Sequence, residues 1–470
     1  MAERLTRAAT SPSPSGPAPT GTVGPRPPAD ETGEVRVDCL GIGFGPANIA
    51  VAVAMEEAGF DGSVLFLESR TGPDWQPDML LEGTDIQNNP LRDFVTPRNP
   101  RSPYGFLSYL QAEGRLFDYL NLDVHYPPRT EFARYVRWVA RHFDPIVSYG
   151  ERAVDMTPTT GEDGRPEVVV TTGLGRRIRA RSLVFAPGRS PLIPAIFQGI
   201  DDDRIAHLTR YLTAVSRWRH EGRLGRVAVI GASQSAVEIV LDLTRRSPGT
   251  RIENIFRSFS YKLKDTSPFT EEIYFPGFVD YYHGMSEDAQ RALSEELWRS
   301  NYGAADHDVI SALHNLLYEQ RLTGRQTVTL HSGRDIVGVE PGEDGIGLDI
   351  APRYGAGGPE RLTVDAVLLA TGFLNFGTGP GREPWHPLLD GIAPHCAKRG
   401  DGSLSVSRDF RVHPAPGAPD LPPILLNGVC ESTHGFGDAG SISLLSVRSW
   451  TILNALLDDA PATPAAAAVG

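Results

Sequence analysis

The chain has 470 residues, of which 40% are hydrophobic and 22% charged, and its formal net charge is −13. These values describe an ordinary globular protein long enough for two or three domains, and the negative charge argues against nonspecific nucleic-acid binding. No run approaches the ~20 apolar residues of a membrane span and no signal-peptide core opens the chain, so a cytoplasmic protein is expected. Cys39, Cys396 and Cys430 form no C-x-x-C pair, which excludes a dithiol redox centre and leaves no zinc signature.

The two ends of the chain differ in composition from the rest. Residues 1–34 are rich in Pro, Ser, Thr and Gly, and residues 457–470 are mostly Ala and Pro. Neither segment has enough large apolar residues to bury a core. Both are therefore expected to be disordered tails.

A glycine-rich turn follows the first apolar run. Residues 35–40 read as a buried strand, residues 41–48 spell Gly-Ile-Gly-Phe-Gly-Pro-Ala-Asn, and residues 49–55 read as a buried helix. This order directs backbone N–H groups and a helix N-terminus at a pyrophosphate. Glu68, at the end of the next strand, is placed to accept hydrogen bonds from a ribose hydroxyl. The residues expected at this first cofactor are Gly43, Gly45, Pro46, Glu68 and Asn48, the last in place of the usual third glycine.

A second turn, residues 231–236, repeats this order after the apolar strand at 226–230. The next strand, at 252–256, ends in Arg257 instead of an acid, and a guanidinium there suits the 2′-phosphate of NADPH better than NADH. The residues expected at this cofactor are Gly231, Ser233, Gln234, Ser235 and Arg257. One glycine-rich turn alone is as often a tight connection as a cofactor site, but two in matching contexts indicate two bound dinucleotides.

The order of these signals predicts an α/β protein with two doubly wound, Rossmann-like domains. Strand-like runs at 183–188 and 366–373 suggest that the second domain is inserted into a discontinuous first domain. The expected divisions are an FAD-binding part, an NADPH-binding domain and a second FAD and substrate part, at residues 35–219, 220–335 and 336–456. Two sequential domains with a cap would also fit this order.

An ordered series of motifs extends along the chain from residue 35 to about residue 456: residues 41–48, 75–81, 85–87, 91–96, 99–110, 129–132, 231–238, 267–269, 301–302, 370–373 and 433–435. With these motifs the chain resembles the flavin-dependent N-hydroxylating monooxygenases that act on the side-chain amine of ornithine or lysine. The stretch at 121–140 is more similar to the ornithine branch.

This resemblance implies that NADPH reduces FAD, that O₂ adds at flavin C4a, and that the resulting C4a-hydroperoxyflavin transfers oxygen to an amine. The cofactor supplies the reactivity, so no protein nucleophile is needed. Gln87 matches a glutamine beside the flavin and Asn301 a residue of the substrate or nicotinamide-ribose site, and these two are expected to be catalytic. The remaining contacts that the resemblance implies are Trp75, Val154, Gln87, Tyr302, Asp438 and Ser443 for the cofactors, and Asn301 and Ser443 for the substrate.

Two substrate positions depart from the family pattern. Arg92 occupies the place of a lysine that holds the substrate carboxylate, and Glu271 replaces an asparagine that contacts the substrate. Arg92 can still bind a carboxylate, whereas Glu271 prefers a cation such as an α-ammonium or the second amine of a diamine. Alternatively, the two pair with each other or one of them faces solvent. The segment 434–443 also carries one residue more than the usual turn, which puts the flavin contacts of Asp438 to Ser443 in doubt.

The sequence therefore predicts FAD- and NADPH-dependent N-hydroxylation of an ornithine-like amino acid by O₂, for siderophore or N–O/N–N natural-product biosynthesis. Lysine, a diamine or another unusual amino acid is the alternative substrate. Two different functions are also considered, a flavin disulfide-reductase-like oxidoreductase and a non-catalytic flavoprotein. The expected partners are the small-molecule amine and O₂, with no nucleic acid, membrane or metal, and the sequence is compatible with a homo-oligomer.

Overall fold

The computed structural model describes residues 33–355 and 357–458. The two expected tails lie outside the described residues, apart from two residues at the inner end of each. The last helix, α11 (Leu445–Asp458), extends through Leu457 and Asp458, so the second expected tail begins two residues too early.

The first sheet has seven strands and a parallel centre. β1 pairs in parallel with β2 on one side and β6 on the other, while β5 and β4 continue the sheet in antiparallel fashion and β17 joins β6. Its strands are β3 (Val147–Tyr149), β2 (Val64–Glu68), β1 (Val35–Ile42), β6 (Arg177–Phe185), β5 (Pro166–Thr172), β4 (Ala153–Thr160) and β17 (Ile424–Leu426).

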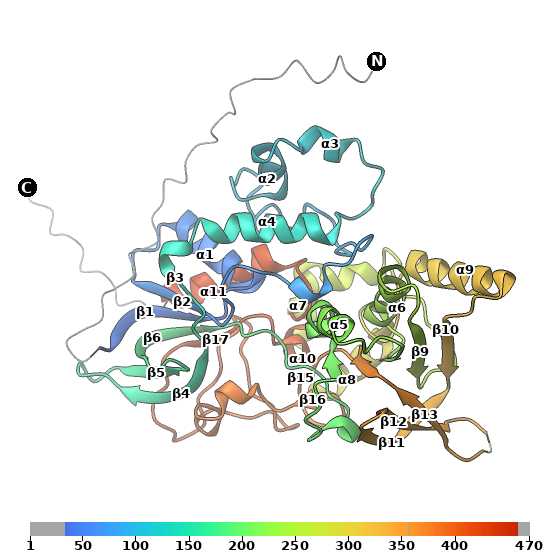
Figure 1. Cartoon of the computed structure of the whole chain (residues 1–470). Helices are drawn as coiled ribbons and strands as arrows, with labels where there is room; N and C mark the ends of the chain where they lie inside the picture. Colours follow the sequence, from blue (N-terminus) through green and yellow to red (C-terminus); the bar gives the residue numbers. More distant parts are fainter. Residues whose placement is uncertain (1–32, 356, 459–470) are drawn as a thin grey trace, which may run out of the picture.

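Helices cover one face of this sheet. In α1 (Pro46–Ala58), residues 48–55 are all buried, because α11 and α4 (Arg129–Arg141) pack around it (Figure 1). The apolar helix expected at 49–55 is therefore confirmed. Two short helices, α2 (Phe106–Ala112) and α3 (Leu116–Leu120), project beyond α4.

The second sheet has five parallel strands in the order β10-β9-β8-β14-β7. Its strands are β10 (Val328–Ser332), β9 (Arg251–Phe256), β8 (Arg226–Ile230), β14 (Ala366–Leu369) and β7 (Ile205–His207). The helices beside it are α5 (Tyr211–His220), α6 (Gln234–Arg246) and α9 (His307–Thr323). An antiparallel sheet of three strands, β11 (Arg334–Gly342), β12 (Gly345–Pro352) and β13 (Glu360–Val364), lies at its lower edge in Figure 1.

The pairing corrects the expected domain division. The strand at 366–369 was assigned to the first domain, but β14 pairs with β8 and β7 in the second sheet. The second sheet thus begins at β7 and ends at β14, and the expected edges at 220 and 335 are wrong for it. The strand that returns to the first sheet is β17. Both β14 and β17 are short, apolar and buried, so their composition could not tell which sheet each would join.

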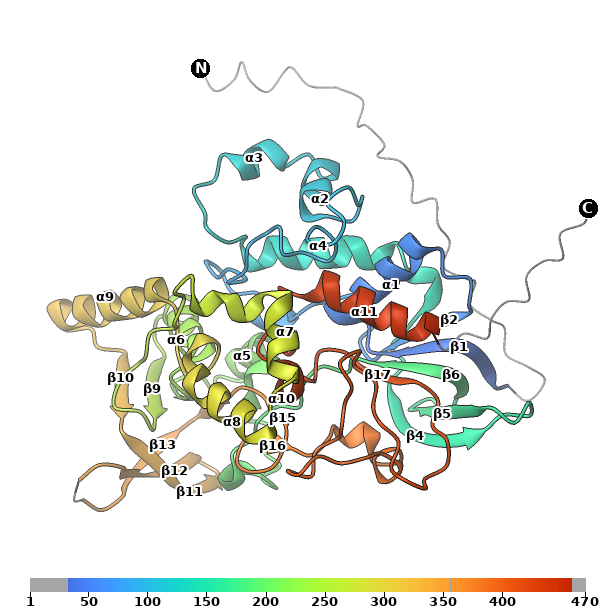
Figure 2. The same cartoon turned by 180° about the vertical axis from the view of Figure 1, so that it is seen from behind.

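Several short elements lie between the two sheets. Seen from behind, α7 and α8 occupy the junction, next to α10 (Figure 2). These elements are α7 (Pro276–His283), α8 (Glu287–Glu296), α10 (Glu431–His434), β15 (Asn375–Phe376) and β16 (Arg382–Glu383). The 3₁₀ turns are at Pro77–Met79, Asp144–Ile146, Ala195–Phe197, Leu208–Arg210, Thr270–Tyr274, Trp298–Ser300, Pro387–Leu389 and Ala393–His395.

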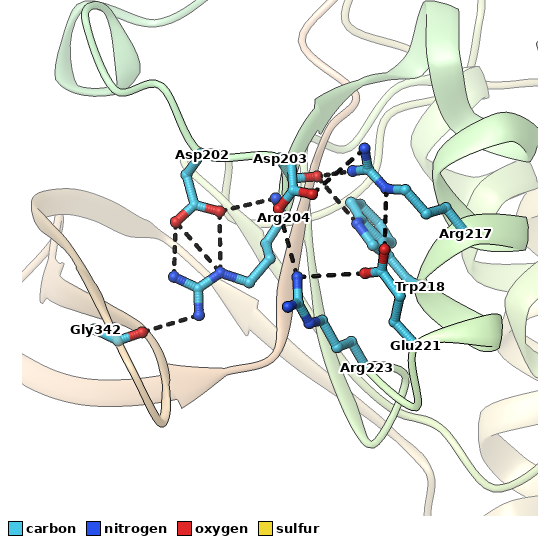
Figure 3. A network of polar contacts seen from close by, with 8 residues as sticks. All are labelled: Asp202, Asp203, Arg204, Arg217, Trp218, Glu221, Arg223 and Gly342. Carbon is cyan, nitrogen blue, oxygen red and sulfur yellow. Dashed lines mark hydrogen bonds and ion pairs between the residues drawn. The ribbon is translucent and has the colours of Figure 1, made fainter.

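A polar network fixes the small antiparallel sheet to the second sheet (Figure 3). Arg204, just before β7, pairs with Asp202 at 2.7 Å and donates to the Gly342 carbonyl of the β11–β12 turn at 2.9 Å. The Asp203 carbonyl accepts a hydrogen bond from Trp218 of α5 at 3.1 Å. The network comprises Asp202, Asp203, Arg204, Arg217, Trp218, Glu221, Arg223 and Gly342. It ties three elements of the second domain together at a distance from the nucleotide turns.

Candidate active site

The first glycine-rich turn has the geometry that a pyrophosphate needs. Gly43 has φ +81°, and a Cβ there would meet the Ala186 carbonyl oxygen at 2.2 Å. A Cβ built on Gly45, the N-cap of α1, meets no atom within 4 Å. Pro46 occupies the first turn of the helix, where its missing N–H costs nothing. The turn is therefore packed on its inner side and open at the helix N-terminus, which fits an FAD pyrophosphate.

Asn48 explains how the turn dispenses with a third glycine. Its buried side-chain amide donates to the Gly43 carbonyl at 2.7 Å and to the Ile42 carbonyl at 3.2 Å. Its oxygen accepts from Asn427, which follows β17, at 3.1 Å. Asn48 therefore holds the turn to the sheet from within. Its side chain has no free donor pointed at a ligand, so the expected cofactor contact is limited to its backbone.

The acidic residue expected at the ribose lies at the end of β2 and is part of the turn. Glu68 accepts a hydrogen bond from the Phe44 backbone N–H at 2.9 Å. Its own carbonyl accepts from the N–H of Glu151, three residues before Val154, which is exposed on β4. This bond brings the segment that leads into β4 next to Glu68. Trp75 packs edge-on against Phe132, with ring centroids 5.6 Å apart.

The second turn has the same construction and opens into a large cleft. Gly231 has φ +137°, and a Cβ there would lie 2.4 Å from the Ala370 carbonyl oxygen. Ser233 is the N-cap of α6. Gly231, Ser233, Gln234 and Ser235 all line a cleft of about 2040 Å³ between the two sheets.

Arg257 follows β9 directly and lines this cleft. The end of β9 is bonded to the second turn, because the Gly231 N–H donates to the Ile255 carbonyl at 3.0 Å. Its side chain is exposed, and Arg334 and Arg353 from the small antiparallel sheet line the same part of the cleft wall. Asp335 partly offsets this charge, because it pairs with Arg353 at 2.8 Å. The surplus of guanidinium groups fits the 2′-phosphate of NADPH.

The residues expected to be catalytic line the same cleft. Gln87 and Asn301 reach it from opposite halves of the molecule, with Tyr302 beside Asn301. Gln87 has φ +52°, a left-handed backbone that non-glycine residues rarely adopt. Its N–H donates to Asp85 Oδ1 at 2.8 Å. Burial raises the pKa of the Asp85 carboxyl, and the acids Asp306, Asp308 and Glu238 raise it further.

Of the expected substrate residues, Arg92, Glu271 and Ser443 gather at the loop that follows Gln87. Asn301 lines the cleft instead, and the other three do not. Arg92 Nη1 lies 3.6 Å from Glu271 Oε2, so the two form an ion pair, which is one of the arrangements expected for them. Ser443 donates to Asn88 Oδ1 at 2.9 Å, and Asn88 Nδ2 donates to the Arg92 carbonyl at 3.0 Å. Asn88, which the sequence analysis did not single out, thus joins the C-terminal segment to the Arg92 loop.

The side chain of Asp438 is engaged inside the protein. Its carboxylate pairs with Arg448 at 2.8 Å and accepts from the Cys430 backbone N–H, and both charged side chains are almost fully buried. The expected flavin contact of this side chain is therefore not supported, because its oxygens are occupied inside the protein. This buried pair fixes the loop that carries the extra residue.

A polar cluster in the cleft wall joins the expected Tyr302 to three residues that the sequence did not single out, Arg189, Asn375 and Glu431. Arg189 Nη1 donates to the Tyr302 hydroxyl at 2.9 Å, and that hydroxyl donates to Glu431. Asn375 Nδ2 donates to Glu431 Oε1 at 2.7 Å. Burial raises the pKa of Glu431 to about 7, opposed by Arg189 and by the hydrogen bond from Tyr302. No motif in the sequence identifies Arg189, Asn375 or Glu431. The only indication was that Arg189 and Glu431 are charged residues within otherwise apolar connecting segments.

Comparison with known proteins agrees with this geometry. The sequence model for L-lysine 6-monooxygenase/L-ornithine 5-monooxygenase matches residues 36–375. The L-ornithine N(5)-monooxygenase of Burkholderia cepacia is 36% identical over 418 residues, which cover 86% of this chain and 90% of that protein. The chain belongs to this family of N-hydroxylating monooxygenases.

Solved structures of this family share the fold. The ornithine hydroxylase PvdA from Pseudomonas aeruginosa is 30% identical, with a TM-score of 0.80 over 90% of this chain and 99% of that chain. The ornithine N-hydroxylase KtzI from Kutzneria sp. 744, with reduced FAD, NADP⁺ and L-ornithine, is 32% identical, with a TM-score of 0.81 over 90% of this chain and 99% of that one. The expectation of two Rossmann-like domains, one inserted in the other, is confirmed.

The chain is thus a flavin-dependent N-monooxygenase, and its cofactors are FAD and NADPH. No helix within residues 33–355 and 357–458 is long and apolar enough to cross a membrane.

Proposed function

We propose that the protein hydroxylates the side-chain amine of an ornithine-like amino acid. The balanced reaction is R–NH₂ + O₂ + NADPH + H⁺ → R–NHOH + NADP⁺ + H₂O. When bound, FAD would take two electrons from NADPH and deliver one oxygen atom of O₂ to the amine by the C4a-hydroperoxide route. The observation that carries the choice of substrate is the ion pair of Arg92 with Glu271.

This pair suits the zwitterionic end of an α-amino acid. Its separation of 3.6 Å is too long for a hydrogen bond, and 28% of the Arg92 and 27% of the Glu271 side chain are exposed. A carboxylate binding to Arg92 and an α-ammonium binding to Glu271 would each gain a charge-assisted hydrogen bond in place of this loose contact. Asn88 and Ser443 fix the Arg92 loop from the other side.

The reacting amine must be neutral to accept oxygen. Its pKa in water is ~10.4, so holding it neutral near pH 7 corresponds to about 4 to 5 kcal/mol, which desolvation in the closed site would supply. The tyrosines near Glu271 are uncharged, so no phenolate favours the protonated form of the amine. Burial raises the pKa of Tyr126, and it likewise raises the pKa of Tyr274, in both cases reinforced by Glu271.

The competing substrates and functions differ in what they require of the same residues. Lysine presents the same zwitterionic end on a chain one methylene longer, whereas a diamine offers a cation for Glu271 but leaves Arg92 without an anion.

A disulfide-reductase-like role needs a reactive thiolate. Burial raises the pKa of Cys39 to about 12 and that of Cys396 to about 11, and the pKa of Cys430 is raised as well. A non-catalytic flavoprotein would have no need of a cleft lined by Gln87, Asn301 and a complete second nucleotide turn.

A panel of amines tests this proposal. Purified protein with FAD, NADPH and air is given ornithine, lysine, putrescine, cadaverine or aspartate, and hydroxylamine product is measured against NADPH consumed. Ornithine should give product nearly equal to the NADPH consumed, and the diamines mostly peroxide. Equal or better coupling with putrescine would overturn the amino-acid assignment. We further propose that the hydroxylamine enters siderophore or N–O/N–N natural-product assembly.

A further inference from the structure

Asp306 occupies a helix-capping position that its side chain does not use. It is the N-cap of α9, yet its carboxylate accepts no hydrogen bond from the first turn of that helix. An aspartate at this position ordinarily satisfies one of those N–H groups. Here the carboxylate instead accepts a hydrogen bond from Nε2 of Gln87, which belongs to the other half of the molecule.

This contact sets the orientation of the Gln87 amide. A carboxylate can only accept hydrogen bonds, so it selects the nitrogen of the amide and leaves Oε1 for other groups in the cleft. The backbone of Gln87 is held in its left-handed conformation, φ +52°, by the hydrogen bond from its N–H to Asp85. Gln87 is thus fixed at both ends, in its backbone by Asp85 and in its side chain by Asp306.

Asp306 is also bonded to the second nucleotide turn. Its backbone N–H donates to Gln234 Oε1 at 2.9 Å, and the Gln234 N–H donates to the Ala304 carbonyl at 3.0 Å. Gln234 Nε2 in turn donates to Glu238 Oε1 at 3.0 Å. A displacement of this turn on binding a dinucleotide would therefore move Asp306.

The contacts close into a ring through a buried ion pair. Glu238 accepts from Arg129 at 2.8 and 2.9 Å, with 3% and 9% of the two side chains exposed. Arg129 Nε donates to the Asp85 carbonyl at 3.1 Å. The ring of Gln87, Asp306, Gln234, Glu238, Arg129 and Asp85 joins the loop of one domain to the nucleotide turn of the other.

We propose that Asp306 is a positioning residue that orients the Gln87 amide and links it to the occupancy of the NADPH turn. The proposal rests on the proposed function, in which Gln87 lies by the flavin. With Gln87 oriented, oxygen passes to the amine. With Gln87 misoriented, the reducing equivalents are lost as peroxide: NADPH + O₂ + H⁺ → NADP⁺ + H₂O₂.

The test replaces Asp306 by two residues that suit an N-cap position, in Asp306→Asn and Asp306→Ser, so that the start of α9 is not disturbed. The matched control is Asp308→Asn, because Asp308 is exposed in the first turn of the same helix and bonds to neither Gln87 nor Gln234 in the described part of the chain. For each variant we would measure hydroxylamine per NADPH, peroxide, flavin content, melting temperature and anaerobic flavin reduction by NADPH.

Asp306→Ser, whose shorter side chain withdraws the acceptor, should lose about fivefold in hydroxylamine per NADPH, the change expected for one lost hydrogen bond, with a matching rise in peroxide. Asp306→Asn keeps one oxygen that can accept from Gln87 but adds an N–H donor that can bind Oε1 of a flipped Gln87 amide, so it should lose less. Flavin content, melting temperature and anaerobic reduction should match those of Asp308→Asn. In a double-mutant cycle, Asp306→Ser combined with Gln87→Ala should give as much hydroxylamine per NADPH as Gln87→Ala alone.

Three results would overturn the inference. The first is parental coupling in both Asp306 variants, and the second is losses that multiply in the double variant. The third is loss of flavin or a lowered melting temperature in both variants, which would make Asp306 purely structural. If the parent enzyme forms no hydroxylamine from any amine, the proposed function fails instead, and that result is read before any variant is made.

Discussion

The two nucleotide turns of this chain share one backbone design and differ in the charge beside them. In both, a glycine of positive φ packs against a carbonyl beyond the neighbouring strand: Gly43 against Ala186, and Gly231 against Ala370. In the first turn the strand-tip acid, Glu68, accepts a hydrogen bond from the turn itself at 2.9 Å. In the second, Arg257 is exposed at the cleft wall.

The glycine-rich motif therefore has two separate roles: it packs the turn against the sheet, and it recognises the ligand. Gly43 and Gly231 are required by the chain that crosses beside each turn, whatever ligand is bound. The residue at the strand tip distinguishes the ligands, and only in the first turn does it also hold the turn. Substitutions at each of these positions can test the difference.

The largest effects should come from Gly43→Ala and Gly231→Ala. Each added Cβ would lie within 2.4 Å of a carbonyl oxygen, so the crossing strand must move. Gly43→Ala should yield colourless or insoluble protein, whereas Gly231→Ala should stay yellow and lose reduction by NADPH. Flavin content and anaerobic reduction are the measurements.

Gly45→Val is the control for that pair, since the Cβ position of Gly45 meets no protein atom within 4 Å. It should fold with a normal melting temperature but fail to retain FAD. A fully yellow Gly45→Val protein would contradict the placement of FAD at this turn.

The junction of the two halves should show a pH effect. Burial raises the pKa of Glu431 to about 7, above its value in the unfolded chain, so the folded state binds this proton more tightly. Its contribution to stability is greatest below about pH 4 and is lost as the pH rises to about 7. Glu431→Gln should therefore gain stability relative to the parent between pH 5 and pH 8, by about 3 kcal/mol at most. Urea unfolding of both proteins at pH 5 and pH 8 measures this. If the difference between their unfolding free energies is the same at both pH values, Glu431 is ionised throughout.

Arg257→Ala should affect one cofactor only. Loss of a charged hydrogen bond to the 2′-phosphate costs ~1.5 to 3 kcal/mol, which raises the KM for NADPH about 10- to 150-fold. The KM for NADH and the melting temperature should not change, because Arg257 is exposed. Steady-state kinetics with both nucleotides decide this, and an equal loss with NADH would remove Arg257 from the phosphate site.

The smallest effect should come from Glu68→Gln, which tests the other half of the comparison. Because Glu68 accepts from the Phe44 N–H, its replacement should weaken FAD binding and lower stability together, by about 1 kcal/mol in each case. Flavin titration and thermal unfolding measure the two. A change in FAD affinity alone would mean that Glu68, like Arg257, serves only the ligand.

Features within continuous segments were predictable from the sequence. Strand, turn and helix follow each other directly around Gly43 and Gly231, and their apolar runs fixed both elements and order. The partner of the strand at 366–369 was not predictable, since β14 and β17 are equally short and apolar. Nor was the ring through Asp306, because its residues come from four separate segments. Arg92 and Glu271 were identified as departures, but only the folded chain brings them within 3.6 Å.

In the proposed reaction, one oxygen atom of O₂ reaches the side-chain nitrogen of an ornithine-like amino acid. The most direct test is mass spectrometry of the product formed from ornithine, NADPH and isotopically heavy O₂. We expect one heavy oxygen atom in the hydroxylamine, in proportion to the NADPH consumed. Heavy oxygen recovered only in peroxide, with ornithine unchanged, would contradict it.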